Sequence, residues 1–69
     1  MGLKKYEDKY VRIIANDDVV WEGGVIDYIC PDDNENNLES IIIRCRVGKF
    51  PGKLIEFYEK DIKSIEIIK

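Results

Sequence analysis

Apolar and polar residues alternate along most of the chain after Tyr10, with the two-residue period of half-buried β-strands. The segment 40–47 shows this most clearly, because every second residue is apolar and two arginines lie between them. Turn-forming Asn, Asp, Gly and Pro residues separate one alternating segment from the next. The pattern predicts five strands, at residues 11–15, 19–30, 40–47, 53–58 and 62–68.

The same alternation predicts which side chains point into the core. Within the second strand, Gly23 and Gly24 mark a bulge, a sharp bend or a close backbone approach. Before the first strand, Leu3 and Tyr6 lie three residues apart in a charged segment, which indicates a short amphipathic helix acting as a lid. The inward positions of the first and third strands are Val11, Ile13, Ala15, Ile41, Ile43, Cys45 and Val47. Three isoleucines fall on the face opposite the inward residues of their own strands, and each needs the N-terminal helix or a neighbouring subunit to cover it. They are Ile14, Ile42 and Ile68.

Short strands joined by turns leave no room for crossover helices, so the fold class is all-β. With 69 residues and no linker, the prediction is one domain spanning residues 1–69. We expect a five-stranded, strongly bent antiparallel barrel, preceded by the short N-terminal helix.

These features resemble the Sm-like (LSM) domain family over nearly the whole chain. Its first motif is a glycine, an aliphatic residue two positions on and an aromatic residue three further, as in Gly23, Val25 and Tyr28. Its second motif is an aliphatic-rich strand, a tight turn and an aliphatic pair spaced by three. The matching residues there are Phe57, Ile62 and Ile65.

The resemblance implies an SH3-like barrel that assembles into rings, the fourth strand of one subunit pairing with the fifth strand of the next. It therefore implies a homo-oligomer, and it also implies association with RNA. The chain differs from uridine-binding members at two places, having Ile29 and Asp33 for their Asp and Asn, and Tyr58-Glu59 for their Arg-Gly. The interface residues implied in the fifth strand are Ile62, Ile65, Ile67 and Ile68.

Charge narrows the range of partners. Eleven basic and fourteen acidic residues give a net charge of −3, so we expect no DNA partner. Binding of single-stranded RNA remains a possible function if the basic residues lie together on one surface. No signal peptide and no apolar stretch of membrane-spanning length is present, which predicts a cytoplasmic protein without a membrane partner. In that compartment the two cysteines are free thiols.

The residue types also argue against catalysis and metal binding. The chain has no histidine, so Ser40, Ser64 and Cys30 lack the usual general base, and we expect no enzyme activity. Two isolated cysteines do not make a zinc site, and the acidic loop 31–39 lacks the glycine of a calcium loop. No metal or cofactor is predicted.

A basic segment is the strongest functional signal. Residues 44–53 contain four basic side chains, one aromatic and no acid, a combination that suits single-stranded nucleic acid. The alternative is a solvated strand face, with Phe50 packed under the turn beside Pro51. Two functions therefore stay open, an RNA-binding module and a protein-interaction or scaffold module. The candidate RNA-binding residues are Arg44, Arg46, Lys49, Phe50 and Lys53, with Tyr28 and Tyr58 for stacking.

Overall fold

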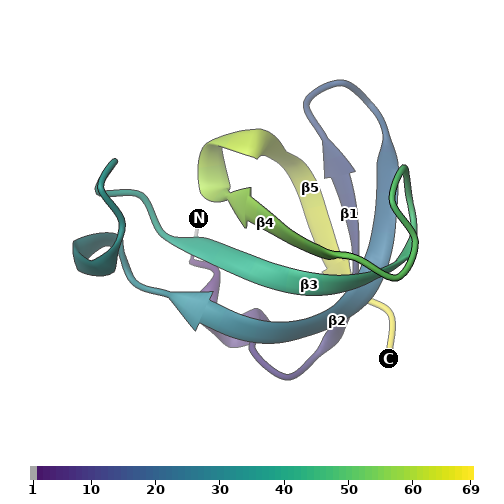
Figure 1. Ribbon diagram of the computed structural model, residues 1–69, viewed down its shortest axis with the longest axis horizontal. Helices are drawn as coiled ribbons and strands as arrows, with labels where there is room; N and C mark the ends of the chain where they lie inside the picture. Colours follow the sequence, from purple (N-terminus) through teal and green to yellow (C-terminus); the bar gives the residue numbers. More distant parts are fainter. Residues whose placement is uncertain (1) are drawn as a thin grey trace.

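A computed structural model describes residues 2–69, which form a five-stranded antiparallel sheet (Figure 1). Across the sheet the strands follow the order β4-β3-β2-β1-β5. Their bounds are β1 Tyr10–Ala15, β2 Val20–Ile29, β3 Ser40–Val47, β4 Leu54–Tyr58 and β5 Ile62–Ile67. Each bound lies within one residue of its predicted position, so the all-β class and the antiparallel strands are confirmed.

The predicted bend in the second strand is present in β2, which curves through the length of the molecule (Figure 1). The β2–β3 ladder shifts register between Glu22 and Gly23, and again between Val25 and Asp27. A Cβ atom on Gly23 would lie 2.2 Å from the carbonyl oxygen of Arg44. Glycine at this position therefore permits the close backbone approach that the sequence indicated.

The prediction of a closed barrel is wrong, because no ladder joins β4 to β5 within residues 2–69. The 3-10 turn η3 (Glu59–Asp61) carries the chain across the opening between these strands instead of folding it back as a hairpin. The Asn16 amide donates to the carbonyl of Asp61 (3.2 Å), and the Glu59 amide donates to the carbonyl of Glu39 (3.1 Å). The sheet is thus open, with β4 and β5 as its two edges.

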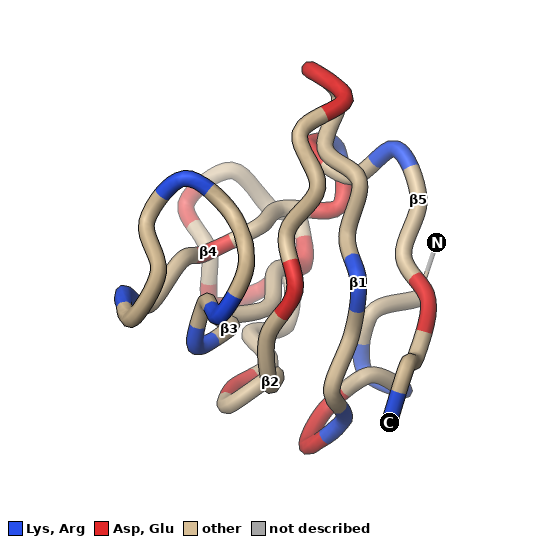
Figure 2. Tube along the Cα trace, turned by 90° about the vertical axis from the view of Figure 1, so that its right-hand side faces the viewer, with Lys and Arg blue, Asp and Glu red and all other residues tan. Residues whose placement is uncertain are grey.

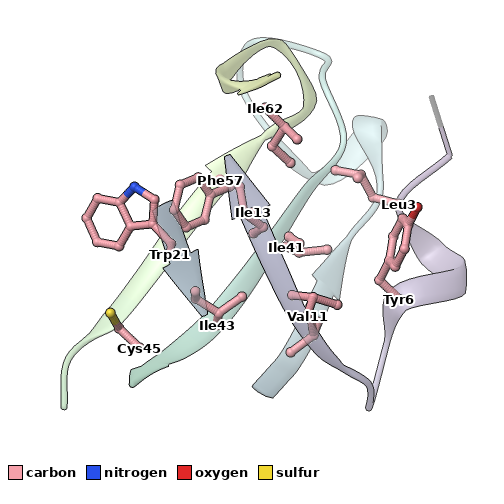
Figure 3. Packing of buried hydrophobic residues seen from close by; sticks show 11 residues of the cluster. Leu3, Tyr6, Val11, Ile13, Trp21, Ile41, Ile43, Cys45, Phe57 and Ile62 are labelled. Carbon is pink, nitrogen blue, oxygen red and sulfur yellow. The ribbon is translucent and has the colours of Figure 1, made fainter. Parts of the chain in front are cut away.

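Inside the bent sheet, the buried side chains form one cluster (Figure 3). Its residues are Leu3, Tyr6, Val11, Ile13, Trp21, Val25, Ile41, Ile43, Cys45, Phe57 and Ile62. The inward positions predicted in β1 and β3 are confirmed except for two residues. Ala15 is half-buried against the cluster, and Val47 lies outside it.

Val47 was predicted to point inward, but 47% of it is exposed. Cys45 pairs with Gly23, whereas Val47 pairs with Glu22, so Arg46 is the extra residue of a β-bulge. A shift of one residue moves a side chain to the opposite face of a sheet. The bulge therefore turns Val47 outward, and alternation alone gives no sign of it.

The N-terminal segment covers the core as predicted, although its helix is only the three-residue 3-10 turn η1 (Lys4–Tyr6). Leu3, which directly precedes this turn, and Tyr6, which is its last residue, are both buried. The Leu3 amide donates to a carboxylate oxygen of Glu39, which fastens the segment to the start of β3. Among residues 2–69, helices are too short to cross a membrane.

Candidate nucleic-acid interface

The turn between β3 and β4, residues 48–53, has a backbone fixed by its own hydrogen bonds. The Gly52 amide donates to the Cys45 carbonyl (2.8 Å), and the Cys45 amide donates to the Lys53 carbonyl (2.8 Å). Gly48 (φ 145°) and Gly52 (φ 85°) both adopt a backbone conformation that favours glycine. The turn is therefore a fixed platform for the side chains that it carries.

Trp21 of β2 supports this turn from beneath. A Cβ atom on Gly48 would lie 2.5 Å from Cε3 of Trp21, so the backbone of the turn packs directly on the indole. The Phe50 ring is tilted 38° to the Trp21 ring, with 6.2 Å between their centres. Because 55% of Phe50 stays exposed, the ring is accessible at the surface and is not packed under the turn.

Basic residues lie on this turn and along the end of β3, where the chain trace is blue in Figure 2. Within residues 2–69, the ion pairs do not involve Arg44, Arg46 or Lys53, and all three are exposed. The fourth, Lys49, lies 3.4 Å from a carboxylate oxygen of Asp17, and both side chains are half exposed. We call this surface the basic turn: Arg44, Arg46, Lys49, Phe50 and Lys53.

Arg12, on the outer face of β1, is neutralised in a way that the basic turn is not. Its guanidinium bonds Glu22 (3.0 Å) on β2 and Glu66 (3.1 Å) on β5, its partners in the two ladders. These carboxylates, Glu22 first, raise the pKa of Arg12. This charge is already satisfied within the sheet, whereas most of the charge of the basic turn faces solvent.

The two tyrosines assigned to stacking do not join the basic turn. Arg44 pairs with Leu54 at the start of β4, whereas Tyr58 pairs with Ser40 at its end, four residues or roughly 13 Å away. Tyr28 pairs with Ile41, also toward that far end. Five of the seven predicted RNA-binding residues therefore lie on the end of β3 and the turn that follows it, whereas Tyr28 and Tyr58 lie toward the other end of the sheet.

Tyr28 has a partner of its own at that end of the sheet. Its hydroxyl donates to a carboxylate oxygen of Glu39 at 3.2 Å. Burial raises the pKa of Tyr28, and the nearby charge of Glu39 raises it further. The side chain is half-buried against the core, so Tyr28 links β2 to the residue that anchors the N-terminal segment.

The isoleucines assigned to an oligomer interface differ in exposure. Ile62 is a core residue, so its side chain offers no surface to a neighbouring subunit, and Ile65 is half-buried against the core. Ile67 is 48% exposed at the β5 edge, and Ile68 is half-buried. Of the four, Ile67 presents the most side chain for an edge contact. The outer-face residues Ile14 and Ile42 are also half-buried.

The side chains that could ligate a metal ion are dispersed in the folded chain. Across residues 2–69, Asp, Glu and Cys side chains make no group of three suited to a metal ion. Cys45 is buried in the core, and Cys30 is half-buried with its thiol 3.2 Å from a carboxylate oxygen of Asp33. The two thiols are free.

A pocket that sequence reasoning missed lies beside the basic turn, where β1 ends. We call it the Trp21 pocket, and its volume is about 270 Å³. The Asn16 side-chain amide donates to the carbonyl of Lys60 (2.6 Å), which brings together two turns that are 44 residues apart. No pattern in the sequence signals this contact. The pocket is lined by Ala15, Asn16, Asp17, Trp21, Phe57 and Asp61.

Asp17 has a fixed orientation in this lining. One of its carboxylate oxygens accepts the Val19 amide (3.1 Å), and the other faces Lys49. The hydrogen bond from Val19 lowers the pKa of Asp17, and Lys49 contributes in the same direction. Asp17 is therefore ionised at neutral pH and connects the Trp21 pocket to the basic turn.

Comparison of the chain with family models, with curated proteins and with solved structures gave no match.

Proposed function

We propose that this chain is a non-catalytic Sm-like binding module whose basic turn binds single-stranded RNA. The observation that carries the proposal is that three exposed basic residues without an ion pair among residues 2–69 (Arg44, Arg46 and Lys53) lie on the end of β3 and the adjoining turn, and the same turn carries the exposed ring of Phe50. This combination supplies both kinds of contact that single strands use, phosphate neutralisation and base stacking.

The Sm-like part of the proposal is supported by topology. The chain has a short N-terminal element, a long second strand bent at glycine, and β4 and β5 as free edges of one antiparallel sheet. Ring assembly in the resembling family joins these same two edges. We therefore propose a homo-oligomer in which β4 of one subunit pairs with β5 of the next, which would satisfy both edges.

In this mode of binding, Arg44, Arg46 and Lys53 contact phosphates while a base stacks on Phe50. Arg44 and Arg46 come from the outer face and the bulge of β3, and Lys53 comes from the turn. Because the backbone of the turn is already ordered, little conformational freedom is lost when a strand binds. Lys49 adds a fourth contact when its exposed ion pair with Asp17 opens.

The test is a titration of fluorescent uridine-rich, adenine-rich and mixed oligonucleotides at low salt. We expect binding that weakens with salt, with a log–log slope of roughly −0.7 for each phosphate contact. The double variant Arg44→Glu/Arg46→Glu should abolish binding. Phe50→Ala should cost about 1–3 kcal/mol of binding free energy.

A matched control separates the basic turn from overall charge. Lys4→Glu/Lys9→Glu reverses two exposed charges on the N-terminal segment, so it changes the net charge by the same amount. This variant should bind nearly as well as the parent. The proposal is overturned if the Arg44→Glu/Arg46→Glu variant remains folded and binds like the parent, or if no oligonucleotide binds at tens of micromolar protein.

A protein-interaction or scaffold module is the second candidate, and the open sheet favours it. Both edges carry an exposed apolar side chain, Leu54 on β4 and Ile67 on β5, and a net charge of −3 does not hinder protein contacts. This function predicts no oligonucleotide binding from the start, so the same titration distinguishes the two candidates.

A further inference from the structure

Gly24 lies within β2, although the fold leaves room for a side chain at this position. Among the glycines of residues 2–69, positive φ angles belong to Gly48 and Gly52, so the backbone conformation of Gly24 does not require glycine. Within the same residues, a Cβ atom on Gly24 would meet one neighbour inside 4 Å, Cδ2 of Tyr10 at 4.0 Å. Glycine inside a strand lowers stability and often marks a place where a ligand approaches the backbone closely.

This open position belongs to a row of residues that crosses the outer face of the sheet. Gly24 pairs with Tyr10 on β1 and with Arg44 on β3, and Arg44 pairs in turn with Leu54 on β4. Directly paired residues project from the same face of a sheet, and here it is the outer face, because Arg44 and Leu54 are exposed. The backbones of Arg44 and Tyr10 are therefore two strands apart, roughly 10 Å, with Gly24 between them.

The Tyr10 end of the row has a basic group beside an aromatic ring. Nζ of Lys69 lies 5.6 Å from the centre of the Tyr10 ring, and the Lys69 amide donates to the Tyr10 carbonyl (3.4 Å). Lys69 is exposed and has no ion pair among residues 2–69. From Leu54 to Lys69, the row thus contains two cations, one aromatic ring, a stretch of bare backbone and no acid.

This composition suits one nucleotide of a single strand. A flat base can lie on backbone that has no side chain, with the ring of Tyr10 on one side, while cations at both ends of the row meet phosphates. Arg44 is also a member of the basic turn, so a strand bound at the turn reaches the row without a break.

We propose that single-stranded RNA bound at the basic turn continues across the outer face of the sheet, with one base over Gly24 and against the ring of Tyr10. The phosphates on the two sides of this base lie at Arg44 and Lys69. The inference rests on the proposed RNA-binding function and adds the direction of the strand, from the turn across β3 and β2 to β1.

The test fills the space over Gly24 with a side chain. Gly24→Val should weaken binding of a fluorescent oligouridine by about tenfold or more, because the base no longer reaches the backbone. The urea midpoint of this variant should rise, because valine suits a strand better than glycine does. The matched control is Ser64→Val, which places the same side chain at an exposed outer-face position of β5, opposite Ile14, and should bind like the parent.

A second pair of variants tests the ring of Tyr10. Tyr10→Phe keeps the ring and should bind like the parent. Tyr10→Leu keeps an apolar side chain without the ring and should bind about fivefold or more weakly.

The proposal is overturned if a folded Gly24→Val variant binds like the parent, or if a folded Tyr10→Leu variant binds as well as Tyr10→Phe. A lower urea midpoint for Gly24→Val would also overturn it, because the fold itself would then account for the glycine. If Arg44→Glu/Arg46→Glu abolishes binding while Gly24→Val does not weaken it, the strand ends at the basic turn and only this inference fails. If the parent binds no oligonucleotide, the proposed function fails and this inference fails with it.

Discussion

Gly23 and Gly24 are neighbours in β2, yet a methyl group at each would meet different surroundings. On Gly23 it would press into the backbone of Arg44, which cannot move without disturbing β3. On Gly24 the nearest atom is Cδ2 of Tyr10 at 4.0 Å, an ordinary contact. We therefore expect Gly23→Ala to cost about 1–3 kcal/mol of unfolding free energy, and Gly24→Ala to change it by less than about 0.5 kcal/mol. Urea unfolding of both variants measures this difference, and equal stabilities would contradict the close approach at Gly23.

Tyr28 should ionise at a higher pH in the folded protein than in the unfolded chain. Burial and the charge of Glu39 raise its pKa, so the folded state holds the phenol proton more tightly than the unfolded state does. The stability that comes from this difference is present below the unfolded pKa and is lost as pH rises through the folded pKa of Tyr28. An ultraviolet titration of the folded protein should show a late phenol ionisation step, above the ordinary tyrosine range, and Tyr28→Phe should remove it. A late step that survives in Tyr28→Phe would assign it to another residue.

Single residues also mark the limit of what alternation predicts. Ile41, Ile43 and Cys45 are buried as their spacing indicates, because a regular strand keeps its period. Val47 follows the same spacing but lies on the outer face, because the bulge at Arg46 is set by pairing with β2. A glycine can signal that a bulge is near, but the sequence does not show which partner strand contributes the extra residue.

Among the elements, the N-terminal segment contributes more to covering the core than its length implies. It is a three-residue 3-10 turn, yet it buries Leu3 completely and binds Glu39 through its backbone. We expect Leu3→Ala to cost about 2–5 kcal/mol of unfolding free energy, as for other buried leucines. The exposed neighbour Lys4 supplies the control, because Lys4→Ala should change stability by less than about 0.5 kcal/mol. Similar thermal unfolding of both variants would contradict a role for this segment in covering the core.

The strands could be predicted from sequence almost to the residue, whereas the Trp21 pocket could not. A strand is a local pattern, and the polar loop 31–39 separates β2 from β3 clearly. The pocket depends on Asn16 meeting Lys60, a contact between two turns that only the complete sheet brings together. For the same reason, the sequence grouped Tyr28 and Tyr58 with the basic turn, although strand register carries them to the other end.

For the molecule as a whole, the two free edges predict self-association. We expect native mass spectrometry at micromolar concentration to show more than one subunit, because within residues 2–69 β4 and β5 each leave one side without a neighbouring strand. Ile67→Lys, at the β5 edge, should shift the population toward monomer. Ile26→Lys is the matched control, since Ile26 is similarly exposed on β2, between two paired strands. A monomer at these concentrations would contradict the edge-to-edge assembly.

The distribution of charge matters more to the proposed function than its total does. The net charge of −3 reduces binding to polyanions in general, but Glu22 and Glu66 are engaged with Arg12, and the basic turn contains no acid of its own. Electrostatic attraction of a single strand is then local to the turn and weakens as salt is added.

The most direct test of the central claim is an amide-resolved NMR titration with oligouridine at low salt. RNA binding at the basic turn predicts that the amides of residues 44–53, with the Trp21 indole beneath them, shift first and most. Amides of the far end, around Tyr28 and Tyr58, should stay in place. No shift at tens of micromolar RNA, or shifts that centre away from residues 44–53, would contradict the account.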